Sequence, residues 1–572
     1  MNTNEILHIN GRYKREYNEA LDKNHLCIKI KTGKDIDYVE LVYNDPYIRI
    51  EHDGNKYALW PRRVAIMERT GNTFNNYYFS AIVEAQYSRL KYYFILHDYD
   101  GNTIQYSESG FTNGYNENDL SMFFIPYIDS DMIIEENNWL HDIVWYQIFP
   151  SSFNKTIKGI EDKLEYLKDL GFNGIYLNPI YKGLSYHKYD VIDYLDIDDD
   201  FFEERTIKSD IEWKKYKLKV FEHFCDKAHK MGFKIMLDLS VTHCSIKNPM
   251  FLDVIKNKDK SEYFKWFKVI LDNDGNLLYE TFGSNNEMPK FQTELFEVRK
   301  YFAQLVIRKW MVSGVDSWRL DVANEISDPM LRTIHEEVKR PNSNSYIVGE
   351  IWHYSSEWIS NYALDGVTNY AMTRAILSFV CDNNHNIFKY RNDIDIIRHS
   401  YELRELKNSM PLLDSHDTRR IRTICNNDID KVKLALVLLL TFYGTPSIYY
   451  GTERYMEGFD DPDNRRKIEW ELIPDDNYDV YNLLKTLINI RHNNPILSND
   501  GDFKFIDHNE LLIYKREKDN EIYYVVINSK EYAIDTVLPW DYDTVNIINN
   551  DNIGKYIHMN RLGFMILYKN GK

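Results

Sequence analysis

Cysteine is scarce in this chain, which has only five cysteines among 572 residues. Cys27, Cys225, Cys244, Cys381 and Cys425 are scattered and form no CxxC pair. The sequence therefore offers neither a disulfide framework nor the ligand spacing of a structural zinc site. This cysteine usage is typical of a protein from a reducing compartment.

Long apolar runs are also missing. The longest, LALVLLLTF at 434–442, spans about half of the roughly 20 residues that a membrane-spanning helix needs, so it predicts a buried helix. The stretch MNTNEILHINGRYKREYNEAL has no apolar segment behind a basic start, and no signal peptide is expected there. We therefore expect a cytoplasmic protein with no membrane association.

Positive charge is in deficit, with 70 basic residues against 88 acidic residues and a formal net charge of −18. Nucleic-acid-binding proteins usually carry a basic patch, and no basic run is visible here. Tyrosine (45) and tryptophan (11) are abundant. Most of these rings pack in cores, but flat amphipathic rings also suit stacking against an uncharged polar ligand such as a sugar.

Residues 1–130 predict a small β-sandwich, because LCIKIK, YVELVY and LKYYFILH alternate between apolar and polar positions. Residues 131–495 instead repeat a helix, a glycine and a strand: IEDKLEYLKDL, for example, is followed by Gly171 and then FNGIYLNPI. About eight such strands predict an α/β fold, the (β/α)8 or TIM barrel. A doubly wound open sheet is the competing topology, but no GxGxxG motif opens a helix.

Two further regions depart from the barrel pattern. Residues 244–298 lack the strand–helix alternation and predict an inserted subdomain after the third strand. Residues 496–572 return to alternating strands and predict a second, C-terminal β-sandwich.

Charged and polar side chains collect at the carboxyl ends of four predicted barrel strands. Because active sites of such barrels lie at that end, we expect these residues to converge. Repeated burial of charge is costly, so packing alone does not explain the pattern. The residues are Asp238 and His243 (third strand), Arg319 and Asp321 (fourth), Glu350 (fifth), and His416 and Asp417 (seventh).

Paired carboxylates in such a site favour acid–base or glycosyl chemistry. A metal hydrolase is the alternative from the residues alone, with the ligands Asp238, His243, Asp321 and His416. However, there is no HxH or HExxH spacing, and Arg319 beside these ligands would repel a cation. Serine hydrolysis has weaker support because no GxSxG motif is present.

The four strand ends resemble the signature regions of glycoside hydrolase family 13, the α-amylase family. The similarity is strongest to its neopullulanase, cyclomaltodextrinase and maltogenic amylase branch. The N-terminal region is similar to carbohydrate-binding module family 34, with VELVYNDPY as its characteristic phrase. The other motifs that carry the resemblance are HKYDVIDY, MPKFQT, DVANE, VGEIWH, LLDSHDT, GTPSIYYGTE and DPDNRR.

The resemblance implies a role for each residue of the cluster. Asp321 is the expected nucleophile, Glu350 the general acid and base, and Asp417 the carboxylate that binds sugar hydroxyls and stabilises the transition state. Arg319 is expected to keep Asp321 ionised and oriented, and Asp238 to hold Arg319. His243 and His416 are expected to donate hydrogen bonds to the sugar that is cleaved, on whose apolar face Tyr189 stacks.

The branch also implies a set of substrate contacts around this centre. His187 is expected at the same sugar, with a purely structural loop histidine as the alternative. The aglycone side is expected to be shaped by Asn324, Glu325 and Trp352, and the glycone side by Asp463 and Arg465.

Two positions depart from the family pattern. Thr242 stands where relatives carry an asparagine that often helps to bind calcium, and Gln292 stands where they carry another asparagine. The region after the first strand, FPSSFNKTIKGIEDKLEYL, has little room for a calcium loop. We therefore expect no metal and no other cofactor, although calcium is found in many relatives.

The expected function is retaining hydrolysis of α-1,4-glucosidic bonds in cyclodextrins and maltooligosaccharides, with pullulan as a further candidate substrate. The alternatives are a transglycosylase or α-1,6-glucosidase on the same scaffold, and a non-catalytic glucan-binding protein. The latter type typically lacks one of the three carboxylates. The resemblance also implies a homodimer in which the N-terminal module partly covers the partner subunit's active site.

Overall fold

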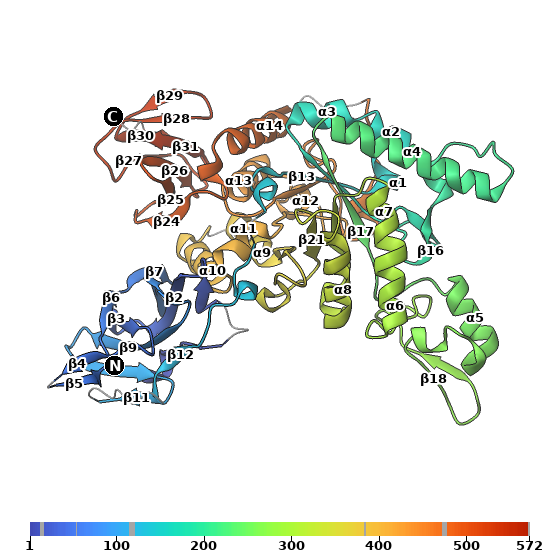
Figure 1. The fold of residues 1–572 in the computed structure, drawn as a ribbon. Helices are drawn as coiled ribbons and strands as arrows, with labels where there is room; N and C mark the ends of the chain where they lie inside the picture. Colours follow the sequence, from blue (N-terminus) through green and yellow to red (C-terminus); the bar gives the residue numbers. More distant parts are fainter. Residues whose placement is uncertain are drawn as a thin grey trace. The chain divides into compact units, whose positions relative to one another are not determined.

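The computed structural model describes residues 1–11, 16–52, 54–113, 121–135, 137–381, 385–471 and 478–569. The chain forms two compact units (Figure 1). The first comprises Met1–Glu136 together with Tyr354–Asn361 and Ile387–Leu406. The second comprises Asn137–His353, Tyr362–Asn386 and Lys407–Lys572. Two segments from within residues 131–495 therefore belong to the same unit as the N-terminal module.

The first unit contains the predicted β-sandwich. Its smaller sheet has the order β1-β2-β8-β7, and its larger sheet has the order β11-β10-β9-β3-β6 with β12 added to β9. Alternate residues of β2, such as Leu26, Ile28 and Ile30, are fully buried in the core between the sheets. The strands are β1 (Asn18–Ala20), β2 (His25–Gly33), β3 (Ile36–Asn44), β6 (Arg63–Ile66), β7 (Glu68–Asn72), β8 (Asn76–Glu84), β9 (Leu90–Asp98), β10 (Thr103–Ser107), β11 (Gly110–Thr112) and β12 (Phe123–Ile125), besides a small hairpin of β4 (Ile50–His52) and β5 (Asn55–Leu59).

A helix from later in the chain completes this unit. α10 (Ile387–His399) packs on β7, where the backbone N–H of Asn72 donates to Asp395 Oδ2 at 2.9 Å. The ring of His399 stacks on Tyr78 with centroids 4.2 Å apart. These polar and aromatic contacts carry no helix-period signal, which explains why the sequence pattern did not assign the segment to the sandwich.

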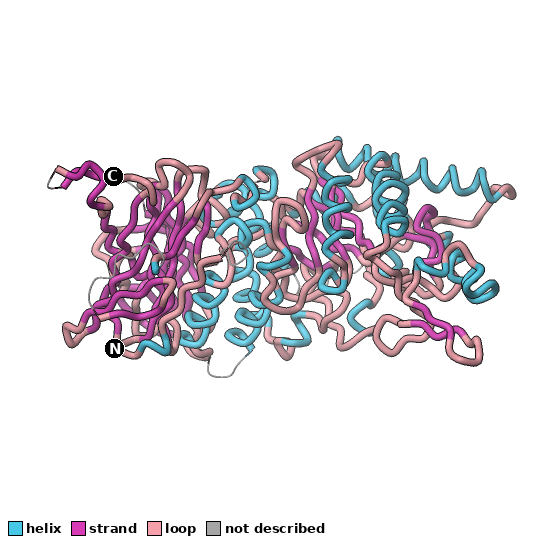
Figure 2. Tube along the Cα trace, turned by 60° about the horizontal axis from the view of Figure 1, so that its bottom comes forward, coloured by secondary structure: helices cyan, strands magenta, loops and turns pink. Residues whose placement is uncertain are grey.

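The second unit is built on a parallel barrel (Figures 1 and 2). Seven strands lie in the order β22-β21-β20-β17-β14-β13-β23. Parallel bridges from Thr368 to Met410 and from Leu412 to Ser447 add an eighth position and close the sheet. The predicted (β/α)8 barrel is confirmed. The strands are β13 (Trp145–Ile148), β14 (Gly174–Leu177), β17 (Lys234–Leu239), β20 (Ser317–Leu320), β21 (Tyr346–Gly349), β22 (Gly366–Val367) and β23 (Ser447–Tyr449).

These strands are buried almost throughout, as expected for parallel strands covered by helices. In Figure 2 the barrel strands lie between helices. The covering helices include α4 (Asp210–Lys230), whose N-cap Ser209 accepts from the N–H of Glu212, and α8 (Asp328–Lys339). The predicted helix over 160–170 is in fact two helices, α2 (Ile157–Glu161) and α3 (Leu164–Leu170), and Gly171 ends the second with φ +97°. The left-handed conformation of Gly171 is one that glycine adopts without steric cost.

The remaining helices of this unit include the predicted buried one. The run at 434–442 lies in and just after α13 (Ile429–Leu440) and is buried throughout. Among the described residues, no helix is long and apolar enough to cross a membrane.

The inserted region after β17 contains α5 (Pro249–Asn257) and a hairpin of β18 (Val269–Leu271) and β19 (Leu277–Tyr279). The C-terminal region forms a sheet in the order β24-β25-β26-β31-β28-β29, with β27 and β30 paired beside it. Its core includes Tyr524, Val526 and Trp540. These strands are β24 (Asp502–Ile506), β25 (Leu511–Lys518), β26 (Glu521–Asn528), β27 (Ile534–Val537), β28 (Thr544–Asn546), β29 (Asp551–Ile553), β30 (Tyr556–Met559) and β31 (Phe564–Lys569).

Candidate active site

The predicted charged residues meet at the carboxyl ends of three adjacent strands. Asp238 lies near the end of β17 and is paired in register with Arg319 on β20, which is in turn paired with Val348 on β21. Asp321 directly follows β20, and Glu350 directly follows β21. The pairing of the barrel strands therefore brings the four side chains to the same end of the barrel.

Arg319 binds three carboxylates with one guanidinium group. Its Nη1 lies 2.7 Å from Asp238 Oδ1 and 2.8 Å from Asp321 Oδ1, and its Nη2 lies 3.0 Å from Glu350 Oε1. Only 2% of Arg319 is exposed, so these interactions are in a largely water-free setting. The fixed fork of the guanidinium suits this role, since it directs its N–H groups in set directions.

Asp238 is held by a second set of donors. Its Oδ2 accepts from the hydroxyl of Tyr176 at 2.7 Å, the hydroxyl of Tyr189 at 2.7 Å and Asn178 Nδ2 at 3.2 Å. Sequence reasoning missed Tyr176 and Asn178. They are two residues apart at the end of β14, so period-2 alternation was the signal that could have placed both on the inner face.

The turn after β20 aims a backbone donor at Glu350. Val322 adopts the left-handed conformation (φ 47°, ψ 49°), which costs an L-residue about 1–2 kcal/mol and is unusual for a β-branched side chain. Its N–H donates to Glu350 Oε2 at 3.0 Å. Backbone strain of this kind persists where the surrounding structure fixes it, and it clusters at functional sites.

His416 connects the centre to Asp417. Its Nδ1 lies 2.8 Å from Gln147 Nε2, and its Nε2 lies 2.7 Å from the Tyr189 hydroxyl and 3.1 Å from Asp417 Oδ2. Burial holds the pKa of His416 well below its usual range, so the ring is neutral near pH 7. Gln147, on β13, is another residue that the sequence pattern missed. Tyr189 lies parallel to His416, with ring centroids 5.5 Å apart.

His243 approaches the second oxygen of Asp321, with its Nε2 4.0 Å from Asp321 Oδ2. Its ring stacks on Phe282 at 4.5 Å, and Thr242 Oγ1 lies 2.9 Å from its Nδ1. Burial lowers the pKa of His243 to about 3, so it too is neutral. Thr242 is thus a partner of His243, a contact that needs no metal.

Trp352 and Arg465 also reach the central carboxylates. Trp352 Nε1 donates to Glu350 Oε1 at 3.1 Å, while its ring stacks on Tyr370 with centroids 3.8 Å apart. Arg465 Nη2 lies 3.4 Å from Asp417 Oδ1. Tyr370 was not predicted, because a stacked pair between separate elements leaves no local pattern.

The other four predicted contact residues do not bond to the three carboxylates directly in this structure, although His187 lies beside Tyr189. Asp463 pairs with Arg466 at 2.8 Å instead of facing the carboxylates. Glu325 pairs with Lys290 at 2.8 Å, and Asn324 beside it is exposed. His187 accepts from the backbone N–H of Tyr189 at 3.1 Å.

The surroundings of Asp321 favour the protonated form of its carboxyl group. Burial raises the pKa of Asp321 well above its usual range, Arg319 lowers it, and Glu350, Asp238 and Asp417 raise it further. The effect of Arg319 has the predicted direction, but burial and the neighbouring anions outweigh it. Burial also raises the pKa of Asp238, so the two aspartates beside Arg319 do not both ionise cheaply.

The position of Arg319 also argues against the alternative of a metal hydrolase. The guanidinium of Arg319 occupies the space between the carboxylates, where a metal ion would have to bind. Among the residues that the structure describes, no group of three or more His, Cys, Asp or Glu side chains is arranged to hold a metal ion.

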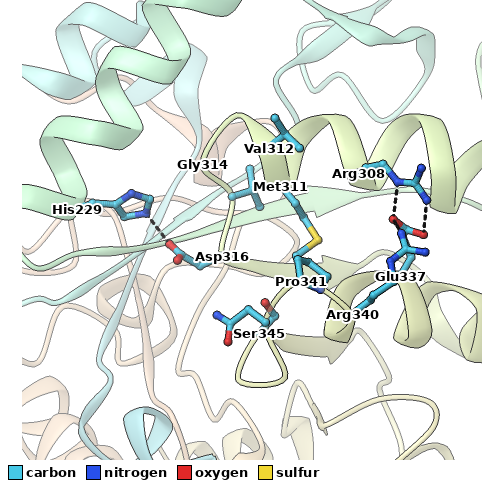
Figure 3. A pocket seen from close by; sticks show the side chains of 12 residues that line it. His229, Arg308, Met311, Val312, Gly314, Asp316, Glu337, Arg340, Pro341 and Ser345 are labelled. Atoms are coloured by element: carbon cyan, nitrogen blue, oxygen red, sulfur yellow. Dashed lines mark hydrogen bonds and ion pairs between the residues drawn. The ribbon is translucent and has the colours of Figure 1, made fainter.

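A separate cavity of about 460 Å³ lies at the opposite end of the strands (Figure 3). It is lined by Gly314 and Asp316, which precede β20, and by His229 near the end of α4. His229 pairs with Asp316 at 2.8 Å, and Arg308 pairs with Glu337 at 2.7 Å. Its position at the amino ends of the strands argues for a role in stability.

Comparison with known proteins decides the family. The family model "Alpha amylase, catalytic domain" matches residues 147–477, and "Alpha amylase, N-terminal ig-like domain" matches residues 1–129. The chain belongs to the α-amylase family. This confirms the resemblance in the strand-end motifs.

Members of the α-amylase family match over nearly the whole chain. A maltogenic alpha-amylase of Bacillus acidopullulyticus is 35% identical over 569 residues, covering 93% of each chain. A cyclomaltodextrinase of Geobacillus thermopakistaniensis (strain MAS1) is 33% identical over 557 residues, covering 91% of each chain. A solved cyclomaltodextrinase structure matches with a TM-score of 0.87 and 27% identity, covering 99% of this chain and 100% of the other.

We predict that Asp238→Asn moves the acidic limb of the kcat/KM–pH profile to lower pH. Asp321, the expected nucleophile, has to be ionised to react. The Asp238 charge raises the pKa of Asp321, so removing that charge should extend activity toward acid. Replacing the charged partner of the 2.7 Å contact to Arg319 by a neutral amide should also lower kcat by about 10- to 100-fold.

The matched control is Asp316→Asn, which removes a partly exposed carboxylate directly before β20, at the opposite end of the strand. It should leave the acidic limb unchanged. An Asp238→Asn profile whose acidic limb stays in place, or moves to higher pH, would contradict the assigned coupling.

Proposed function

We propose that this protein is a retaining glycoside hydrolase that cleaves α-1,4-glucosidic bonds in cyclodextrins and maltooligosaccharides, with pullulan as a further candidate. The observation that carries the proposal is the single guanidinium of Arg319 in contact with both Asp321 and Glu350. The names of the relatives, maltogenic amylase and cyclomaltodextrinase, support the substrate class.

The proposed reaction is a double displacement. Asp321 attacks the anomeric carbon and forms a β-glycosyl ester while Glu350 transfers its proton to the leaving oxygen. Glu350 then removes a proton from water, and this water attacks the same carbon and releases Asp321. Two inversions return the α configuration.

The neighbouring groups prepare the two carboxylates. Arg319 fixes the orientation of both, and the Val322 N–H holds Glu350 through its second oxygen. The neutral rings of His243 and His416 can donate hydrogen bonds to sugar hydroxyls without adding positive charge near the oxocarbenium-like transition state. Asp417, paired with Arg465 and His416, supplies a carboxylate for the same hydroxyls.

Two alternative functions can be distinguished from this proposal. A transglycosylase or α-1,6-glucosidase would use the same carboxylates but a different acceptor or linkage. A non-catalytic glucan-binding protein is disfavoured because Asp321, Glu350 and Asp417 are all present.

The test measures the anomeric form of the first product. Proton NMR monitors it during cleavage of β-cyclodextrin, maltotriose, pullulan and starch, each assayed in parallel. We predict α-anomeric product that mutarotates later, and cleavage of cyclodextrin and maltotriose. Asp321→Asn should lower the rate by several orders of magnitude while the fold is retained. β-Anomeric first product would contradict the mechanism, and transfer products in place of free sugars would favour the transglycosylase.

The proposal includes no metal cofactor. Calcium needs several oxygen ligands, and Thr242, at the position where relatives carry a calcium-binding asparagine, bonds to His243 here. The same assays should therefore give unchanged rates after dialysis against EDTA.

We further propose a cytoplasmic homodimer that acts on small or cyclic glucans. The sandwich exposes apolar side chains on two strands: Val64 and Ile66 on β6 are 55% and 63% exposed, and Ile82 on β8 is 65% exposed. Arg63 of β6 pairs with Glu84 of β8 at 3.2 Å, which links the two strands. The two strands belong to different sheets of the sandwich but contact each other. Contiguous exposed apolar patches mark protein interfaces, and an isologous dimer is the commonest assembly.

We predict a dimer in sedimentation at micromolar concentration and a cyclodextrin-to-starch activity ratio well above one. The double variant Ile66→Lys/Ile82→Lys should sediment as a monomer, with relative activity on starch increased, because desolvating two lysines opposes association. Tyr556→Lys, at an exposed position of β30, should remain dimeric as the control. A wild-type monomer that still prefers cyclodextrin would show that the partner subunit does not set the preference.

A further inference from the structure

We propose that Cys381 and Cys425 form a reversible dithiol–disulfide pair that exchanges with small disulfides and cross-links α9 to the segment between α12 and α13. This site lies outside the catalytic cluster, and the proposed glucan chemistry does not use it.

The two sulfur atoms are already in contact. Cys381 Sγ and Cys425 Sγ lie 3.7 Å apart although 44 residues separate them in the chain. Both thiols are free. A disulfide needs about 2.05 Å between the sulfurs, so rotation about the side-chain bonds must close the remaining gap.

The elements around the pair are firmly packed. Cys381 is the last residue of α9 (Tyr370–Cys381), and Cys425 is the C-cap of α12 (Ile421–Ile424). α9 packs against α13, which begins at Ile429. The sulfurs are therefore held in contact by a helix pair that does not depend on the bridge.

The two thiols differ in accessibility in the way that an exchange reaction requires. Cys381 is partly exposed, whereas Cys425 is only 1% exposed. The Cys425 thiol and the Lys431 ammonium both lower the pKa of Cys381, while the contact with Cys381 and burial raise the pKa of Cys425. Cys381 is thus the attacking thiolate, and Cys425 is the thiol that resolves the mixed disulfide.

The other three cysteines lack this environment. Burial raises the pKa of Cys27 to about 11, and it raises the pKa of Cys225 and Cys244 well above the usual range. Oxidation should therefore concentrate on Cys381, since the thiolate is the reactive form.

The exchange proceeds in two balanced steps. The Cys381 thiolate attacks one sulfur of a small disulfide R–S–S–R, that S–S bond breaks, and R–S⁻ leaves and takes a proton from water. Cys425 then loses its proton and attacks Cys381 Sγ, and the second R–S⁻ leaves. Two protein thiols are oxidised, and one small disulfide is reduced to two thiols.

A disulfide between Cys381 and Cys425 would restrain a segment that contributes residues to the candidate active site. The chain between the two cysteines contains His416 and Asp417, and α9 begins at Tyr370, which stacks on Trp352. Because the sulfurs already touch, the bridge should leave the catalytic geometry intact. Its effect should be stabilisation against unfolding, since a cross-link over a long loop restricts the unfolded chain.

The test exposes the full-length protein to graded ratios of reduced and oxidised glutathione, alkylates the remaining thiols and maps the peptides by mass spectrometry. We expect the Cys381 and Cys425 peptides to lose alkylation together and to appear as one linked pair that dithiothreitol releases. Cys27, Cys225 and Cys244 should remain alkylatable after denaturation. The oxidised protein should unfold a few degrees higher than the reduced protein, with kcat changed less than twofold.

Two variants separate the steps. Cys425→Ser should stop at one glutathione per chain, attached to Cys381, and Cys381→Ser should not react. Cys27→Ser is the matched control and should behave as the wild type. Earlier oxidation of Cys27, a stable glutathione adduct on wild-type Cys381, or an unchanged unfolding temperature after bridging would overturn the proposal.

Discussion

One buried cation organises the catalytic end of the barrel. Arg319 contacts Asp238, Asp321 and Glu350, which come from three adjacent strands, and almost none of its surface is exposed. Burial of a charge costs free energy. A protein in which well-packed apolar residues replace a buried ion pair is often no less stable. Removal of one partner, by contrast, typically costs about 3–5 kcal/mol because the other charge is left unpaired. The cluster is therefore better explained by chemistry than by stability.

The remaining contacts reinforce that arrangement from several sides. Tyr176, Asn178 and Tyr189 hold Asp238, while the strained turn at Val322 directs a backbone N–H to Glu350. Trp352 donates to the other Glu350 oxygen and stacks on Tyr370. Each carboxylate thus has donors that fix its orientation, and all three share one guanidinium.

Much of this could be predicted from sequence because it follows from strand periodicity and strand ends. The motifs around Asp321, Glu350 and Asp417 placed the residues on the correct strands, and the alternation of apolar residues gave the barrel and the sandwich. Tyr176 and Asn178 could have been added by the same alternation. Gln147, Tyr370 and Phe282 could not, since nothing in their local sequence indicates which residues they contact.

Sequence patterns also did not predict local backbone conformation or the exact helix boundaries. No local signal indicated the left-handed Val322, because valine disfavours that conformation and only the surrounding structure imposes it. The break between α2 and α3 interrupts a continuous apolar period, and the packing of α10 with the sandwich rests on polar contacts. Both depend on tertiary structure that a periodic pattern does not encode.

The central claim is that the geometry of Arg319, and not only its charge, orients Asp321 and Glu350, the two carboxylates proposed to carry out catalysis. The most direct measurement is kcat/KM for Arg319→Lys on β-cyclodextrin, beside circular dichroism to verify the fold. Lysine keeps the positive charge but lacks the planar fork, so the account predicts a folded protein with kcat/KM lowered by at least about 100-fold. A folded variant whose kcat/KM stays within tenfold of the wild type would contradict it.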